Sequence, residues 1–195
     1  MLHARTPTHT AHCTTPCTAL RSLIASLWLA LAGMAQVQAQ GSTVVIGGAL
    51  LDTYHAVWAR LVQLAGGRGA CFAVFATAAG QPDEAAAAIA ANLARHGAGA
   101  EHIRVGPKIS GQDVAAAVQD PQWLNKVRDC CGVFFSGGAQ ERLLDTPQPA
   151  GQATPLLQAV RAVWQAGGVV AGTSSGAAVL STLAFRDAPE PLRVM

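Results

Sequence analysis

Short apolar runs alternate along this chain with segments of helical periodicity. The runs that predict strands are 43–46, 71–75, 102–105, 132–135 and 168–171. The segments that predict helices are 53–65, 82–95, 112–119, 121–129 and 155–166. Strands that are apolar almost throughout are typical of a parallel sheet covered by helices on both faces. We therefore expect one α/β domain, whose ligands bind beyond the carboxyl ends of the strands.

The first 39 residues do not fit this alternation. Residues 1–20 are rich in Thr, His and Pro, and Arg21 then precedes an apolar run over residues 23–32. Val37-Gln38-Ala39 follows, with small residues where a signal peptidase requires them. The run is shorter than the roughly 20 residues of a membrane span. We expect a leader and secretory signal in 1–39, a domain in 40–195, and a secreted or periplasmic protein. A buried core helix is the alternative interpretation of the run.

The charge balance argues against nucleic acid as a partner. The chain has 13 Lys and Arg against 11 Asp and Glu, a net charge of +2. Arg5 and Arg21 lie in the expected leader, so the remaining residues carry equal numbers of each sign. Nucleic-acid binding needs a basic stripe that displaces counterions, and the sequence offers none. We therefore expect no nucleic-acid partner and, after signal cleavage, no membrane partner.

Cysteine usage gives little support for a metal site. Cys13 and Cys17 lie in the expected leader, which leaves Cys71, Cys130 and Cys131. Their spacing matches neither C-x-x-C nor a Cys/His ligand set, so no metal is expected. Three is an odd number, and adjacent cysteines rarely bridge each other. We therefore expect all three to be buried as free thiols that behave as small hydrophobic residues.

A G-x-S-x-G pattern occupies residues 172–176, between the expected strand 168–171 and a helix-prone run over 177–180. This context is that of a nucleophile elbow, a tight strand-to-helix turn that lifts the central serine above the sheet. Gly172 and Gly176 are expected there because a Cβ would collide with the turn's own backbone. Ser174 is the candidate nucleophile, with free N–H groups and the helix dipole stabilising developing negative charge. The alternative is a Gly/Ser turn or helix cap that binds nothing.

Three segments carry a resemblance to a known family. Residues 168–179, GVVAGTSSGAAV, resemble the nucleophile segment G-V-V-A-G-T-S-A-G-A-A of the cyanophycinases, serine peptidases related to peptidase E. Residues 132–143, GVFFSGGAQERL, resemble the family's second signature, F-F-T-G-G-D-Q-x-R-L. Residues 44–49 resemble its first strand and glycine turn, and the likeness extends over about 43–184. It implies a three-layer α/β/α sandwich, flavodoxin-like or class I glutamine-amidotransferase-like. The implied substrate is cyanophycin, a poly-aspartate with Arg on each β-carboxyl, which is released as β-Asp-Arg dipeptides.

The resemblance also implies roles for individual residues. Ser174 would form the acyl-enzyme, the N–H groups of Gly138 and Ser175 would form the oxyanion hole, and Gln140 would contact substrate. Two residues depart from the family pattern. Ser175 stands where the family has Ala, and Ala139 stands where it has Asp, which leaves the substrate preference at that edge open. No cofactor is implied.

The sequence does not show the base that a serine nucleophile requires. The family places its histidine downstream of the serine, in a D-Q-H-F-like segment, whereas here no histidine follows Ser174. The histidines of the expected domain are interpreted as solvated or structural; they are His55, His96 and His102. Asp187 and Glu190 do follow Ser174, in a Pro-broken tail predicted as loop. We therefore expect a C-terminally incomplete domain that is catalytically poor as this chain.

The sequence is compatible with several functions. The leading interpretation is a secreted cyanophycinase-like serine peptidase acting on a peptide or cyanophycin-like polymer. The alternatives are a peptidase-E-like dipeptidase for N-terminal Asp and a non-catalytic binding protein that has lost the triad. Asp52 and Glu141, near the first and second glycine turns, are candidate acids for recognising Arg side chains. The glycine pairs at 47–48 and 137–138 match no phosphate-binding spacing, and a homodimer is left open.

Overall fold

The computed structural model describes residues 40–182 and 184. Its centre is one five-stranded parallel sheet in the order β1-β5-β4-β2-β3. The expected α/β fold with a parallel sheet is confirmed, whereas the expected signal segment 1–39, Asp187 and Glu190 lie outside the described residues. The strands are β1 (Ser42–Ile46), β2 (Cys71–Phe75), β3 (Gly99–His102), β4 (Gly132–Phe135) and β5 (Val169–Thr173).

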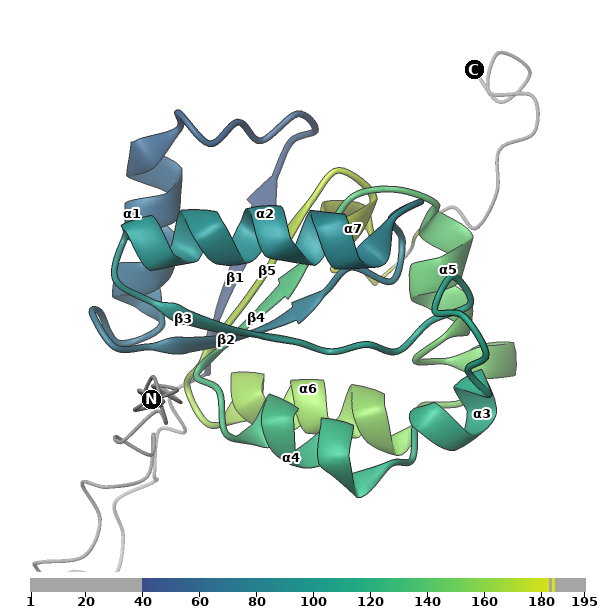
Figure 1. Ribbon diagram of the computed structural model, residues 1–195. Helices are drawn as coiled ribbons and strands as arrows, with labels where there is room; N and C mark the ends of the chain where they lie inside the picture. Colours follow the sequence, from purple (N-terminus) through teal and green to yellow (C-terminus); the bar gives the residue numbers. More distant parts are fainter. Residues whose placement is uncertain (1–39, 183, 185–195) are drawn as a thin grey trace, which may run out of the picture.

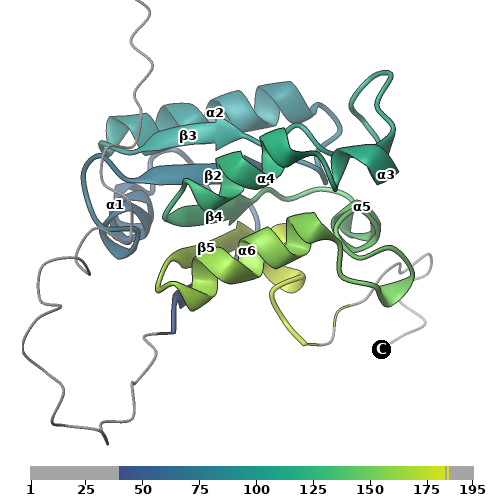
Figure 2. The same cartoon turned by 90° about the horizontal axis from the view of Figure 1, so that it is seen from below.

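Helices cover both faces of the sheet, so the domain has three layers (Figure 1). One face carries α1 (His55–Leu64) and α2 (Pro82–Arg95), and the other carries α4 (Pro121–Arg128) and α6 (Pro155–Gln165). Figure 2 shows α4 and α6 side by side on their face. The shorter elements are α3 (Val114–Ala117), α5 (Gln140–Asp145), η1 (Pro149–Gly151) and α7 (Ser175–Ala178).

Each face of the sheet has its own hydrophobic core because side chains alternate along a strand. Phe72 and Phe134 are completely buried under α1 and α2, and the Trp58 ring stacks on Phe134 with 5.6 Å between centroids. Ala73 and Phe75 point to the opposite face, into the core formed with α4 and α6. Two apolar faces explain why β2 and β4 are apolar throughout.

The third strand lies earlier in the sequence than expected. Residues 102–105 are predicted as strand, but β3 covers Gly99–His102. It pairs only with β2, in a register that runs from Gly99 opposite Cys71 to His102 opposite Val74. Pairing therefore stops close to the end of β2. Ile103 and Val105 lie beyond the strand and are buried in the core, which explains the misleading apolar signal.

The expectation of three free thiols is wrong for two of the cysteines. Cys71 and Cys130 form a disulfide, with 4.6 Å between their Cα atoms and a sequence separation of 59. Cys71 opens β2, and Cys130 precedes β4, the neighbouring strand, by two residues. Strand pairing therefore brings together two cysteines that are far apart in sequence. Cys131 lies outside the disulfide and is buried, as expected.

Candidate active site

Three turns meet at the carboxyl ends of adjacent strands. Because β5 lies between β1 and β4, the turns that follow these three strands are neighbours. The Ser174 N–H donates to the carbonyl of Ile46, at the end of β1, over 3.1 Å. On the other side, the Ser175 hydroxyl donates to the carbonyl of Gly138, in the turn after β4, over 2.6 Å. The expectation that these turns lie together at one edge is confirmed.

Ser174 has a backbone conformation that non-glycine residues rarely adopt. Its φ is 54° and its ψ is −123°, between the last residue of β5 and the first residue of α7. Such a conformation costs on the order of 1–3 kcal/mol and persists only where the surrounding structure imposes it. Its side chain is exposed at the carboxyl edge of the sheet. This is the geometry of a nucleophile elbow, in which the serine stands above the sheet.

The two glycines of the G-x-S-x-G pattern are required by close contacts. A Cβ at Gly172 would collide with the carbonyl of Gly176, so the turn crowds its own backbone as expected. A Cβ at Gly176 would instead collide with the carbonyl of Phe135, on the neighbouring strand β4. The first glycine therefore permits the turn, and the second permits the turn to pack against the sheet.

Backbone also approaches the Ser174 side chain from both sides. A Cβ at Gly137 would lie 3.0 Å from the Cβ of Ser174, which is closer than almost all real contacts. A Cβ at Gly48 would lie 3.7 Å from the Ser174 hydroxyl oxygen. Glycine at these positions leaves room beside the hydroxyl while keeping backbone within reach of a group bound there.

The structure brings the two expected oxyanion donors together. Gly138 has a φ of 141°, and a Cβ there would collide with the carbonyl of Ala78. The same carbonyl accepts the N–H of Ala139 over 2.9 Å, which holds this turn against the turn after β2. Within the described residues, the N–H groups of Gly138 and Ser175 donate to no protein acceptor. Among the described residues, both groups therefore remain available as hydrogen-bond donors.

The expected contribution of the helix dipole is smaller than the sequence indicates. The helix that follows Ser174 is α7, which has only four residues. A single turn aligns few peptide dipoles, so most of the available stabilisation comes from individual N–H groups.

The other candidates for substrate contact lie in or next to α5. Gln140 is its first residue, follows Ala139 and is partly exposed. Glu141 is exposed in the first turn of this helix. The Asp52 carboxylate instead forms an exposed ion pair with Arg95, 3.4 Å away on α2.

Sequence reasoning missed a function for Arg142. Its guanidinium donates to the carbonyls of Ala78 and Ala79, over 3.1 and 3.2 Å. These carbonyls lie in the turn after β2, against which Gly138 packs. Arg142 therefore joins α5 to the turn after β2, against which the Gly138 turn packs. The signal was available, because Arg142 is the arginine of the second signature.

None of the three histidines within the described residues lies at Ser174. The His55 ring is 5.5 Å from the His96 ring, and His96 is at the end of α2 that leads into β3, at the amino edge of the sheet. His102 ends β3, three strand spacings from β5, or about 14 Å. Its Nδ1 is 3.4 Å from a carboxylate oxygen of Asp83. Burial lowers the pKa of His102 below its ordinary value, opposed by the charge of Asp83.

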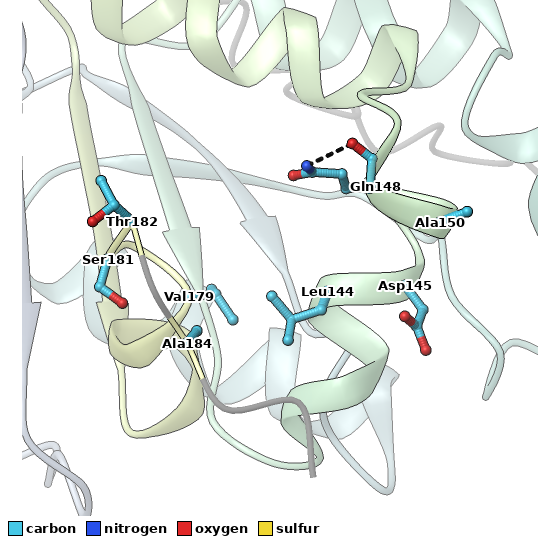
Figure 3. Close-up of a pocket in the computed structure, with 9 residues that line it drawn as sticks. Leu144, Asp145, Gln148, Ala150, Val179, Ser181, Thr182 and Ala184 are labelled. Atoms are coloured by element: carbon cyan, nitrogen blue, oxygen red, sulfur yellow. Dashed lines mark hydrogen bonds between the residues drawn. The ribbon is translucent and has the colours of Figure 1, made fainter.

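A cavity of about 410 Å³ lies beside the elbow but does not include Ser174 (Figure 3). It opens between the α5–η1 region and the residues after α7, so it borders the carboxyl end of that helix, whereas Ser174 precedes its amino end. Its lining mixes apolar and polar side chains: Leu144, Asp145, Gln148, Ala150, Gly151, Val179, Ser181, Thr182 and Ala184.

Two features are absent from the residues that the structure describes. No helix among them is long and apolar enough to cross a membrane. No group of three or more His, Cys, Asp or Glu side chains among residues 40–182 and 184 could hold a metal ion.

No family model matches the chain, but solved structures do. A crystal structure of a peptidase from an acI-B1 Actinobacterium matches with a TM-score of 0.58 and 25% sequence identity, over 75% of this chain and 59% of that protein. A protein of Listeria monocytogenes EGD-e, provisionally assigned as a peptidase E, matches with a TM-score of 0.51 and 15% identity. That match covers 72% of this chain and 62% of the Listeria protein.

The chain thus spans about three fifths of the length of each of these proteins. The likeness to the Listeria protein concerns the fold, because the identity is low. In the match to the actinobacterial peptidase, a quarter of the aligned residues are also identical. Together the neighbours show that this chain has an α/β fold that peptidases use.

Proposed function

We propose that this chain carries the nucleophile of a secreted serine peptidase of the cyanophycinase type, which cleaves cyanophycin to β-Asp-Arg dipeptides. The observation that carries the proposal is the conformation of Ser174, held at positive φ where three turns converge. A non-glycine residue in this conformation is costly, so its presence at the carboxyl edge favours a functional role over a simple turn.

The proposed reaction begins when the Ser174 hydroxyl oxygen attacks the carbonyl carbon of the scissile amide. A base takes the serine proton, and the carbonyl oxygen becomes an oxyanion that the N–H groups of Gly138 and Ser175 stabilise. The C–N bond then breaks, and the amine leaves with a proton. Water hydrolyses the resulting ester, which releases the carboxylic acid and restores Ser174. In this proposal the base comes from outside the described residues, because His55, His96 and His102 all lie elsewhere.

Two further features support parts of the proposal. The disulfide between Cys71 and Cys130 is typical of an oxidising compartment, which favours secretion or a periplasmic location. Glu141 is exposed next to Gln140 at the start of α5, in the segment that follows the Gly138 turn. Its carboxylate is the acid that we propose for recognising the Arg side chains of the polymer, now that Asp52 is paired with Arg95.

A dipeptidase of the peptidase E type is the second candidate, and the fold of the Listeria neighbour favours it. The two candidates differ in the linkage that they cleave. Cyanophycin offers a polymer with β-linked Arg, whereas the dipeptidase requires a short peptide with N-terminal Asp. Incubating the protein in parallel with cyanophycin, α-linked poly-aspartate and an Asp-Leu dipeptide, each with imidazole supplied as the base, distinguishes them. Cleavage of the dipeptide alone would favour the second candidate, and equal cleavage of both polymers would remove the cyanophycin assignment.

A fluorophosphonate probe tests the nucleophile without depending on turnover. Attack by the Ser174 oxygen forms an O–P bond, releases fluoride and passes the serine proton to solvent or to a base. Imidazole added to the buffer can act as that base where the protein's own is absent. We expect an adduct that maps to the peptide containing Ser174, whose formation imidazole accelerates, and no adduct in Ser174→Ala. Equal labelling of the two proteins, or none in either, would overturn the proposed function.

A further inference from the structure

Two hydroxyl groups flank Ser174 and link the elbow to the turns on either side. The Thr173 hydroxyl donates to the carbonyl of Gly47, in the turn after β1, over 2.8 Å. The Ser175 hydroxyl donates to the carbonyl of Gly138, in the turn after β4, over 2.6 Å. The second link is the notable one, because it joins the two residues whose N–H groups would form the oxyanion hole.

We propose that the Ser175 hydroxyl is a positioning group that fixes the Gly138 peptide relative to the Ser175 N–H and so sets the spacing of the oxyanion hole. This inference rests on the proposed function. The resemblance does not supply it, because the corresponding family residue is Ala, which has no hydroxyl. In this chain, the serine that departs from the family pattern has a hydroxyl with a defined acceptor, the carbonyl of Gly138.

The need for such a link follows from the geometry of Gly138. Its φ of 141° belongs to a region that glycine enters with little resistance, so the local backbone does not hold itself there. Its carbonyl accepts the Ser175 hydroxyl, and the next N–H, of Ala139, donates to the carbonyl of Ala78. The peptide between Gly138 and Ala139 is thus held from both sides. Holding this peptide also holds the Cα of Gly138, to which its nitrogen is bonded, and so limits how far the Gly138 N–H can move.

An oxyanion hole is sensitive to such restriction. Its donors act only when they lie about 3 Å from the position that the oxyanion takes, and losing one donor costs about 10²–10³ in rate. Loosening a donor without removing it costs less. Loss of the Ser175 hydroxyl is therefore expected to slow attack by Ser174 roughly tenfold, while leaving the initial noncovalent binding of a probe unchanged.

The test compares the full chain with Ser175→Ala, Ser175→Thr and the control Ser181→Ala. Ser181 also donates a hydroxyl hydrogen bond, to the carbonyl of Ala178 over 2.7 Å, but this bond stays at the end of α7. The rate of fluorophosphonate labelling, measured with imidazole over a range of probe concentrations, separates the binding constant from the maximal rate. We expect a roughly tenfold lower maximal rate in Ser175→Ala, recovery in Ser175→Thr, which keeps the hydroxyl, and no change in Ser181→Ala.

Amide hydrogen exchange provides a second readout that does not depend on reactivity. Exchange of the Ala139 N–H, which donates to the carbonyl of Ala78, is expected to accelerate in Ser175→Ala and to remain unchanged in Ser181→Ala. Wild-type labelling at Ser174 with an unchanged maximal rate in Ser175→Ala would overturn this inference and leave the proposed function intact. Absence of labelling in the wild type would overturn the proposed function instead. Unchanged exchange of the Ala139 N–H in Ser175→Ala would by itself contradict a positioning role.

Discussion

The two ends of the parallel strands are built in different ways. At the amino ends, the Cys71–Cys130 disulfide joins the start of β2 to the residues that lead into β4. At the carboxyl ends, three turns are held by backbone and hydroxyl hydrogen bonds, and Ser174 is exposed in a costly conformation. The amino ends thus favour stability, and the carboxyl ends hold a strained arrangement suited to chemistry. We therefore expect changes at the amino ends to alter stability and changes at the carboxyl ends to alter the reactivity of Ser174.

Removing the disulfide is expected to have the largest effect on stability. Closing a loop of 59 residues restricts the unfolded chain, and the chain-entropy relation gives about 4 kcal/mol. The double variant Cys71→Ala/Cys130→Ala should lose that amount in urea unfolding, while its labelling rate at Ser174 stays unchanged under folding conditions. A lost labelling rate in a variant that is still folded would show that the amino ends also control the site.

Gly172→Ala, at the carboxyl ends of the strands, should lower both the stability of the protein and the reactivity of Ser174. The added Cβ collides with the carbonyl of Gly176, which cannot move without displacing the elbow from β4. We expect a loss of about 3 kcal/mol in the free energy of unfolding, typical of severe overpacking, together with loss of Ser174 labelling. Gly80→Ala is a matched control, because a Cβ at Gly80 meets nothing within 4 Å. Equal stability of the two variants would show that the turn is not as tight as described.

Ser174→Gly should separate strain from function. Glycine adopts positive φ without a Cβ penalty, so the variant is expected to gain about 1 kcal/mol of stability while losing the nucleophile. Ser174→Ala loses the same hydroxyl but keeps a Cβ, and it should show no such gain. Thermal unfolding of the two variants beside the wild type measures the difference. A stability for Ser174→Gly no greater than that of Ser174→Ala would mean that the elbow is unstrained.

The smallest expected effect is on the pH dependence of stability and concerns His102, which lies on the edge strand β3, away from the nucleophile elbow. Because burial lowers its pKa in the folded state, the unfolded chain binds its proton more readily. Stability should therefore decrease as the pH falls from the ordinary histidine pKa of about 6.5 through the lower folded value. Urea unfolding between pH 7.5 and 5 should show a shallower loss in His102→Asn than in the wild type. A steeper loss in the variant would mean that Asp83 outweighs burial.

Much of the fold could be predicted from local sequence. The bounds of β2, β4 and α2 match the expected ones, because each is a continuous run of one hydrophobic pattern. The elbow was also predictable, since its glycines and its place between a strand and a helix are local features. β3 was misplaced because Ile103 and Val105 are buried without belonging to a strand.

The sequence by itself determined the alternation of strands and helices, the parallel sheet and the position of the elbow, because these depend on residues close together in the chain. The tertiary structure alone decided which distant groups meet. Cys71 reaches Cys130, Ser175 reaches Gly138, and Arg142 reaches Ala78, each across tens of residues. Such contacts depend on the order β1-β5-β4-β2-β3, which is set by how the helices pack on both faces of the sheet and not by any local pattern.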